Sequence, residues 1–268
     1  MVESFHSRTE FSMLDRLMRL EAEYARFNRR RSLSRIDEGA VEIAMSSHGL
    51  VIRDASFLDN TYVNRLSIAA SSQYVLDAPS DVQRIDVFSL VAATEGLSAI
   101  EGFEVEYSLN FFEHGLEIIP SREMNNDVRV ELCQNPDLFL NEVGRSIGRA
   151  ISEEIRIAKR SHYCSNEFRC YTAHLDDTVA GIATLYVQHG TGWLANAFTF
   201  EAFRNRGVQS ALVQHRLDDC RTLGLRSAIT DVEPDTTSER NVQRFGFKKI
   251  ASAAVWEAVQ SSSARQPV

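Results

Sequence analysis

Arg204-Asn205-Arg206-Gly207-Val208-Gln209-Ser210-Ala211-Leu212 is the stretch that decides the fold, because it is a basic loop that runs directly into an amphipathic helix. The first backbone N–H groups of a helix lack intrahelical partners, and with the positive end of the helix dipole they bind phosphate. Gly207 has no Cβ, so the main chain can approach an anion closely. Arg204 and Arg206 add charge that a diphosphate attracts. The stretch predicts a phosphate-binding loop, and the alternative is a solvated turn.

A fixed order of strands and helices is predicted around this loop. Two strands with a hairpin turn at His189-Gly190-Thr191-Gly192 precede it. The helix that follows it ends at Gly224, and a short strand and a polar helix start come next. The predicted elements are strands over 179–187, 192–200 and 226–232, a helix over 210–223, and a short helix from Thr237 that closes on Phe245-Gly246-Phe247.

This order resembles the GNAT superfamily of acyl-CoA-dependent N-acetyltransferases, over about residues 165–258. In that family an Arg/Gln-x-x-Gly-x-Gly/Ala loop binds the CoA pyrophosphate, and Arg204-x-x-Gly207-x-Gln209 resembles it. Asn241 with Gly246-Phe247 is similar to the family's later Asn-x-x-x-x-Gly-Phe element. Two positions depart from the pattern: Gln209 replaces a second Gly or Ala, and Glu201 stands where Pro is frequent. The loop acts through backbone N–H groups, so an outward-pointing Gln209 is compatible with it.

The resemblance implies acetyl-CoA as the acyl donor and assigns residues to it. The pantetheine arm is expected along strand 194–200, in a split between parallel strands, with backbone groups around Phe198, Thr199 and Phe200 as its partners. Asn241 is expected to hold the arm near the thioester. The pyrophosphate is assigned to the N–H groups of Gly207, Val208, Gln209 and Ser210, flanked by Arg204 and Arg206.

The acid and base of the reaction are not fixed by the motifs. The family often has a general-acid Tyr near the Gly-Phe close, where this chain has Phe245, which cannot donate a proton. Either another group protonates the thiolate or it leaves unaided, as its modest pKa permits. The catalytic candidates are Asp231, Glu233 and Tyr186, and each carboxylate has an alternative interpretation as a surface group. His189 fits the hairpin turn better than a catalytic role, and Asn196 in mid-strand needs a partner or faces the cleft.

Composition predicts a globular cytoplasmic protein. The chain has 268 residues, 44% hydrophobic and 25% charged, with no apolar run long enough for a membrane span and no signal-peptide core at its N-terminus. Its formal net charge of −8 argues against nucleic-acid binding. The four cysteines lack CxxC spacing; Cys164 and Cys170 near His162 and His174 suggest zinc, but reduced thiols are favoured and no metal is expected.

The fold class expected for the whole chain is α/β (α+β), a mixed central sheet flanked by helices, with two related halves. Outside the acetyltransferase-like part, the periodicity predicts helices over 1–31, 81–97, 103–112 and 138–159, and strands over 41–45, 49–52, 62–68 and 116–120. The predicted domains are 1–130, 131–260 and a disordered tail over 261–268.

Two echoes between the halves hint at an internal repeat. A helix–Gly–Leu–strand step at Gly115 resembles the one at Gly224, and strand 62–68 with Asn64 resembles 193–199 with Asn196. Some GNAT proteins are tandem, with a degenerate first copy that lacks the CoA loop, and nothing between residues 68 and 86 resembles that loop here. The N-terminal half is therefore expected to line the acceptor side; the alternative is an unrelated α+β extension.

The resemblance predicts an acetyl-CoA-dependent N-acetyltransferase that acts by direct transfer on a primary amine of a small or amino-acid-like acceptor. Two alternatives stay open. One is a transferase that uses aminoacyl-tRNA, against which the acidic charge and the intact loop argue. The other is a non-enzymatic acyl-CoA-binding sensor or interaction protein, which the missing Tyr supports. Neither nucleic acid nor membrane is expected as a partner, and the sequence leaves the oligomeric state open.

Overall fold

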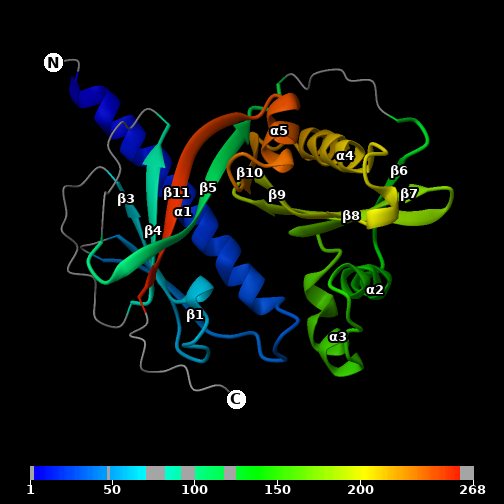
Figure 1. The fold of residues 1–268 in the computed structure, drawn as a ribbon, viewed down its shortest axis with the longest axis horizontal. Helices are drawn as coiled ribbons and strands as arrows, with labels where there is room; N and C mark the ends of the chain where they lie inside the picture. The colour runs from blue at the N-terminus through cyan, green and yellow to red at the C-terminus, as the bar shows by residue number, and fades with distance from the viewer. Residues whose placement is uncertain (1–2, 47–48, 71–81, 92–99, 118–124, 260–268) are drawn as a thin grey trace. The chain divides into compact units, whose positions relative to one another are not determined.

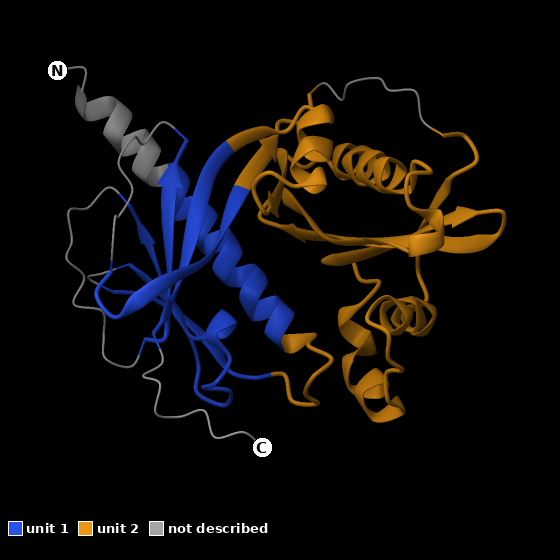
Figure 2. Ribbon diagram, in the orientation of Figure 1, with its two compact units in different colours: residues 1–29, 39–110, 250–268 blue, residues 30–38, 111–249 orange. Residues whose placement is uncertain are grey.

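The computed structural model describes residues 3–46, 49–70, 82–91, 100–117 and 125–259, with side chains from residue 13 onward. The chain forms two compact units that interleave along the sequence (Figure 2). Unit 1 comprises residues 1–29, 39–110 and 250–268, and unit 2 comprises residues 30–38 and 111–249. The domain ranges 1–130 and 131–260 stay predictions, and the predicted tail 261–268 lies outside the described residues.

Unit 1 is a mixed sheet with the long helix α1. Strand β3 is antiparallel to β2 and parallel to β4, and β4 is antiparallel to β11, the last strand among the described residues. Within this unit the strand order is β1-β2-β3-β4-β11-β5. The elements are α1 (Glu3–Arg30), β1 (Val41–Met45), β2 (Leu50–Asp54), the 3-10 turn η1 (Thr61–Val63), β3 (Arg65–Ala69), β4 (Arg84–Leu90), β5 (Phe103–His114) and β11 (Lys248–Ala258).

Buried charges join α1 to the sheet of unit 1. Arg65 on β3 is fully buried and pairs with Glu21 of α1 and, at 3.1 Å, with Asp86 of β4. Arg84 donates to Asp86 at 2.8 Å, which completes a network of two cations and two carboxylates. A buried charge must be paired to be tolerated, so this network fixes how α1 lies on β3 and β4.

Unit 2 contains the predicted acetyltransferase-like part. Its strand order is β5-β10-β9-β8-β7-β6, where β5 contributes its last residues, Phe111–His114. Helix α4 covers one face of this sheet, and α2 and α3 lie on the other (Figure 1). The elements are β6 (Arg129–Cys133), α2 (Pro136–Ser146), α3 (Glu153–Lys159), η2 (Arg160–His162), β7 (Phe168–Leu175), β8 (Thr178–Gln188), β9 (Thr191–Thr199), η3 (Glu201–Phe203), α4 (Val208–Thr222), β10 (Ser227–Val232) and α5 (Thr237–Arg244).

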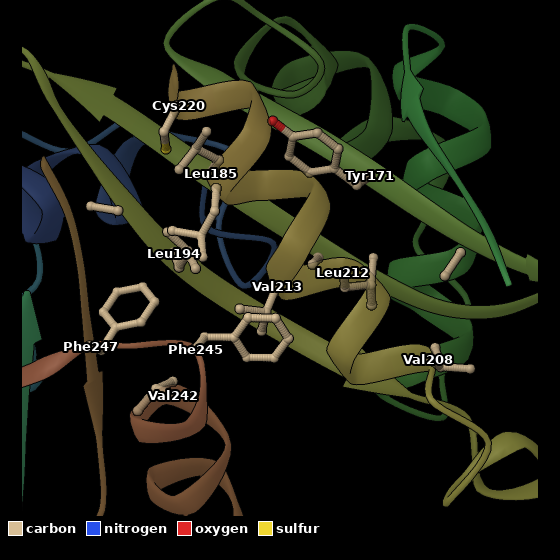
Figure 3. Packing of buried hydrophobic residues seen from close by; sticks show 14 of the residues in the cluster. Tyr171, Leu185, Leu194, Val208, Leu212, Val213, Cys220, Val242, Phe245 and Phe247 are labelled. Carbon is tan, nitrogen blue, oxygen red and sulfur yellow. The ribbon is translucent and has the colours of Figure 1, made fainter. Parts of the chain in front are cut away.

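The core of unit 2 lies between α4, α5 and the sheet (Figure 3). Leu212, Val213 and Leu217 of α4 are buried in the same cluster as Leu185 of β8 and Leu194 of β9. Two glycines allow the close approach: a Cβ on Gly181 would lie 2.8 Å from Val208 Cγ1, and one on Gly192 would lie 2.6 Å from Cys220 Sγ. Helix α4 can therefore rest directly on the backbone of β8 and β9.

Three predicted elements are wrong. Residues 84–90, within the predicted helix 81–97, form β4, and the predicted helix 103–112 lies in β5. Gly115 thus follows a strand, so its helix–Gly–Leu echo of Gly224 is lost, and of the predicted strand 116–120 only residues 116 and 117 are described and are not strand. The predicted helix 138–159 is broken into α2 and α3, because Gly148 adopts a φ of 69° that ends α2.

Candidate active site

The centre of the site is a bulged hairpin. Strands β8 and β9 are joined by His189-Gly190, both with positive φ (50° and 74°), as a two-residue type I′ turn requires. The pairing shifts between Ala183 and Thr184, which face Ala197 and Ala195. Asn196 is the extra residue, with φ 26°, and its Nδ2 lies 3.5 Å from Thr184 Oγ1. This bulge bends β9 at Asn196, the polar residue that stands out in the middle of the predicted strand.

Arg216 of α4 holds the bulge from the helix side. Its Nη1 donates to the carbonyl oxygens of Thr184 and Ala195, both at 3.1 Å, and its Nε donates to Leu212 O at 3.0 Å. The side chain is buried, with 2% of the residue exposed. It therefore satisfies backbone carbonyls on both strands beside the extra residue.

Strands β9 and β10 separate after a short stretch of pairing. Their parallel pairing covers only Ser227–Ile229 against Thr191–Trp193, although both strands continue. At the point of separation, Thr230 Oγ1 donates to Leu194 O at 3.0 Å, so a side chain takes the place of a ladder N–H. No ladder pairing joins the later residues of β9 and β10 in the described chain, as a split between these parallel strands would require.

The predicted phosphate loop leads into the N-terminus of α4. Gly207 is the N-cap, with φ 84°, and no side chain caps the first turn, which has no acidic residue. Asn205 also has a positive φ, 62°. Asn125, from a distant part of the chain, donates through Nδ2 to Arg206 O at 3.0 Å and braces the loop. The N-terminus of the helix is thus arranged as an anion-binding site.

The structure places most of the residues predicted for the acyl donor along one path, from β9 to α4. Phe198 and Thr199 end β9, Phe200 follows, and the loop joins them to Val208, Gln209 and Ser210 in the first turn of α4. Arg204 and Arg206 are exposed beside Gly207. Thr199 Oγ1 is buried and has no hydrogen-bond partner in the described part of the chain, as fits an incoming polar ligand. Asn241 lies half-buried on α5, and no contact joins its side chain to this path.

Two of the three catalytic candidates meet at Trp193. Tyr186 is the cross-strand partner of Trp193, and Trp193 Nε1 donates to Asp231 Oδ1 at 2.9 Å. Their neighbours Leu185 and Leu194 belong to the α4 core, so Tyr186 and Trp193 point to the opposite face. Burial raises the pKa of Asp231, and the Trp193 hydrogen bond opposes that shift. Burial thus makes the Asp231 carboxylate a stronger base than an exposed one, as suits a group that accepts a proton.

Glu233, the third catalytic candidate, is separate from that pair and is exposed beyond the end of β10. The Tyr186 hydroxyl is buried and donates to Gln188 Oε1 at 3.0 Å. Phe245 packs in the core with 1% of its surface exposed, so the position of the family's Tyr is filled by a structural side chain.

Sequence reasoning missed several residues of the site. Trp193, Arg216, Thr230 and Asn125 all contact it, and none was a candidate. Arg216 carried a signal, because it lies four positions after Leu212 and four before Cys220, on the otherwise apolar face of the helix. Asn125 carried none, since it reaches the loop from 81 residues away.

The described residues contain no group of three or more His, Cys, Asp or Glu side chains placed to hold a metal ion. None of the helices described has the length and hydropathy needed to cross a membrane.

Comparisons with known proteins agree with this geometry. A family model described as "Acetyltransferase (GNAT) family" matches residues 144–247. Among solved structures, a GCN5-related N-acetyltransferase from Kribbella flavida is similar at a TM-score of 0.62 and 12% identity, over 91% of this chain and 97% of that one. A functionally unknown conserved protein from Staphylococcus epidermidis gives 0.57 and 13%, over 82% and 94% of the two chains. A GCN5-related N-acetyltransferase from Sphaerobacter thermophilus gives 0.53 and 16%, over 81% and 76%.

At these identities the structural likeness shows the fold alone, and no curated protein matches the chain. The family model adds the sequence evidence, and it spans the hairpin, the loop before α4 and the Gly246-Phe247 close. Residues 144–247 therefore resemble the GNAT acetyltransferase family in both sequence and fold.

Proposed function

We propose that this protein is an acetyl-CoA-dependent N-acetyltransferase that transfers acetyl directly to the primary amine of a small or amino-acid-like acceptor. The observation that carries the proposal is the split between β9 and β10 beside the uncapped N-terminus of α4. The two features adjoin, because Phe198 O of β9 and Val208 Cγ1 of α4 both lie 2.8 Å from the position of a Cβ on Gly181.

The chain would hold the donor at two places. The N–H groups of Gly207 to Ser210 would bind the pyrophosphate, with Arg204 and Arg206 beside them. Backbone groups of Phe198 and Phe200 would pair with the two amides of the pantetheine arm, with the hydroxyl of Thr199 as a further polar partner. Asn241 is proposed to steady the arm from α5.

Donor binding supplies a thioester, whose carbonyl carbon accepts the amine while the C–S bond breaks and the sulfur leaves as a thiolate. We assign Asp231 as the base that accepts the proton of the amine, because its raised pKa and its placement by Trp193 fit that step. Glu233, exposed beyond it, passes the proton to solvent. Tyr186 provides a hydroxyl on the same face as Trp193 and is our candidate for protonating the thiolate.

Acetyl-CoA binding is tested by thermal unfolding. A ligand at about 100 times its Kd stabilises the folded state by about 2.7 kcal/mol, so saturating acetyl-CoA is expected to raise the Tm by several degrees. Gly207→Glu is expected to abolish the shift, because it puts a negative charge and a Cβ at the phosphate seat. Gly115→Ala is the control, since a Cβ there meets nothing within 4 Å. No shift in the wild-type protein at saturation would refute the proposal.

Catalysis is tested by release of CoA thiol across a panel of primary amines. Release with amines, and none with charged tRNA, is the expected result. The buried Phe245 favours one second candidate, a protein that binds acyl-CoA without turnover. Tight donor binding with no thiol release across the panel would support that candidate instead.

A further inference from the structure

Three of the four cysteines lie together in unit 2, outside the residues assigned to acyl transfer. Cys133 ends β6 and is directly opposite Cys170 of β7 in the antiparallel pairing. Cys164, in the short loop between η2 and β7, donates its N–H to Cys170 Sγ at 3.3 Å. All three are free thiols. The fold thus gathers cysteines that are up to one helical hairpin apart in the sequence.

The sulfur atoms of this cluster contact one another. A hydrogen bond links the thiols of Cys133 and Cys164, and a second one links Cys164 to Cys170. Opposed residues of an antiparallel pair have Cβ atoms about 4.5–5.5 Å apart, so the strand pairing alone places Cys133 near Cys170. Cys133 and Cys164 are therefore close enough to be joined by a covalent bond without rearrangement of the sheet.

A tight turn fixes Cys164 in this position. Its φ is 54°, in the left-handed region that few residues other than glycine adopt. The turn is closed from both sides: Ser165 N–H donates to Phe168 O at 3.1 Å, and Phe168 N–H donates to Ser165 Oγ at 3.0 Å. The position of the Cys164 thiol is thus set by the backbone of the loop.

The three thiols differ in their access to solvent. Cys133 and Cys164 are partly exposed, whereas Cys170 has 0% of its surface exposed. Tyr171 belongs to the core under α4, so its neighbour Cys170 points to the opposite face of the sheet. A small reagent from solvent can reach Cys133 and Cys164 and is kept from Cys170.

We propose that Cys133 and Cys164 are a modification site, at which a low-molecular-weight disulfide of the glutathione type converts the two thiols into a reversible disulfide. The Cys164 thiolate attacks one sulfur of the reagent, whose S–S bond breaks and releases one thiolate. Cys133 then attacks the Cys164 sulfur of the mixed disulfide and displaces the second thiolate. Two electrons pass from the protein to the reagent, and the protons of the two cysteines go to its released thiolates.

The surroundings of the pair set the order and the pace of these steps. The hydrogen bond with Cys133 favours the thiolate of Cys164, but the bond with Cys170 and burial outweigh it and raise the pKa of Cys164 to about 12. The hydrogen bond with Cys164 and burial raise the pKa of Cys133 as well. Few thiolates form at neutral pH, so the pair responds to sustained rather than brief oxidation.

The bond would tie together the two ends of residues 134–163, the segment that contains α2, α3 and η2. This modification goes beyond the proposed acyl transfer and does not depend on it.

A redox titration of the full chain tests the inference. Reduced protein is incubated for hours at rising ratios of oxidised to reduced glutathione, and its intact mass and free thiols are measured. Wild type is expected to lose two hydrogen atoms and two free thiols, and to recover both in dithiothreitol. Cys133→Ser and Cys164→Ser should each abolish this change. Cys220→Ala, which removes the cysteine under α4, is the control and should behave as wild type.

Peptide mapping of wild type without reductant identifies the bond even where a variant fails to fold. Trypsin places each cysteine of the cluster on its own peptide: Cys133 on 130–145, Cys164 on 161–169 and Cys170 on 170–204. A linked pair of the first two peptides is the expected product.

Four outcomes would overturn the inference. They are an unchanged mass at every glutathione ratio, a glutathione adduct that is never resolved, a linked peptide that contains Cys170, and a disulfide that persists in Cys133→Ser or Cys164→Ser. Each of them leaves acetyl-CoA binding and the proposed function intact.

Discussion

Asp231 combines a structural hydrogen bond with an environment that disfavours its charge. Trp193 Nε1 donates to its Oδ1 at 2.9 Å and holds the carboxylate on β10, two residues after the β9–β10 pairing ends at Ile229. Burial raises its pKa above the ordinary value of 3.8, which brings its basicity closer to that of a group that accepts a proton at neutral pH. Burial of this carboxylate does not stabilise the fold by itself, so the placement fits a chemical role better than a packing role.

Asp231→Asn separates catalysis from stability. The amide oxygen can still accept the Trp193 hydrogen bond, so the fold should be retained and the Tm should not fall. Removing the base is expected to lower the rate of CoA thiol release about 100-fold, at the low end of what general-base catalysis contributes. Paired measurements of Tm and thiol release check this. An unchanged rate would show that Asp231 is not the base.

The stability of the same variant should depend on pH in a defined direction. Because the pKa of Asp231 is raised in the folded state, the folded protein binds its proton more tightly than the unfolded chain does. Ionisation therefore costs stability, a cost absent below the unfolded pKa of about 3.8 and complete above the folded pKa. Wild type should lose unfolding free energy relative to Asp231→Asn as the pH rises through that window, and a difference of the opposite sign would contradict the shift.

Among the residues that the structure describes, Arg216 is a buried cation that pairs with no carboxylate. Burial lowers its pKa to about 10, and its partners are three carbonyl oxygens. Burying a charge in this way is costly, so its use at the bulge indicates that the geometry of Asn196 and Thr184 matters to the protein.

At the scale of elements, the first turn of α4 is positioned by the backbone of β8. Gly181 pairs with Thr199, and a Cβ at this glycine would come within 2.8 Å of both Phe198 O and Val208 Cγ1. Backbone on one side and a buried side chain on the other leave nothing that can move freely. The spacing between β8 and the phosphate-binding end of α4 therefore depends on the missing side chain.

Gly181→Ala is expected to push α4 away from the sheet. Overpacking of a filled core costs about 1–3 kcal/mol of stability. The affinity for acetyl-CoA should also fall, because the two proposed parts of its binding site, on β9 and on α4, would be displaced relative to each other. Urea unfolding and acetyl-CoA titration measure the two effects. Gly115→Ala, with open space around its Cβ, should stay within about 0.5 kcal/mol of wild type. If Gly181→Ala is as stable as wild type and binds acetyl-CoA as tightly, the space between Gly181 and α4 accommodates the added Cβ and the prediction is wrong.

The elements that could be predicted from the sequence are those that are determined by residues close together in the chain. The β8–β9 hairpin follows from His189-Gly190 between two apolar runs, and the phosphate loop from its glycine and arginines. Strand β4 was mistaken for a helix because the charged residues Arg84 and Asp86 are buried on it, and Arg65, which pairs with Asp86, lies on another strand. In β5, residues 104–107 are exposed on both faces, and the strand forms against β11, far along the chain. The bulge at Asn196 depends likewise on Arg216 of α4.

The strands of the two units support the proposed repeat. In unit 1, β2 is antiparallel to β3 and β3 is parallel to β4, as β8, β9 and β10 are in unit 2. The pairs differ in one respect: β3 and β4 stay paired from Leu66 to Ala69, and Ala70 N–H still bonds Phe88 O at 2.7 Å. Over the residues described here, up to Ala70, this pair stays joined and leaves no split for a pantetheine arm, as expected if only the C-terminal unit takes the donor.

At the scale of the whole molecule, the units are not consecutive segments. Unit 1 takes its last strand, β11, from beyond unit 2 in the sequence, and β11 pairs with β4 from Leu90↔Ala251 to Arg84↔Glu257. It also carries Trp256 of the buried cluster with Leu66 and Ile85. Unit 1 cannot be complete until β11 has been made.

Fragments test this dependence. Residues 1–110 alone are expected not to fold, because β4 and β5 lack the strand between them. Residues 1–110 joined through a short Gly/Ser linker to residues 248–259 should regain cooperative unfolding, measured by circular dichroism in urea. Cooperative unfolding of 1–110 alone would show that β11 is dispensable.

The early separation of β9 from β10 has a further consequence, for solubility. An unpaired strand edge is a template for other chains, and proteins with exposed edges tend to aggregate. Here the exposed edge lies inside the sheet, and the pairing of Ser227–Ile229 closes it at one end. A foreign strand would have to extend past that paired end. A short linear molecule with two amide groups would not, because it can end before the pairing begins. The same unpaired stretch of β9 that would accept a pantetheine arm is thus protected from pairing with strands of other chains, the contact that causes aggregation at exposed edges.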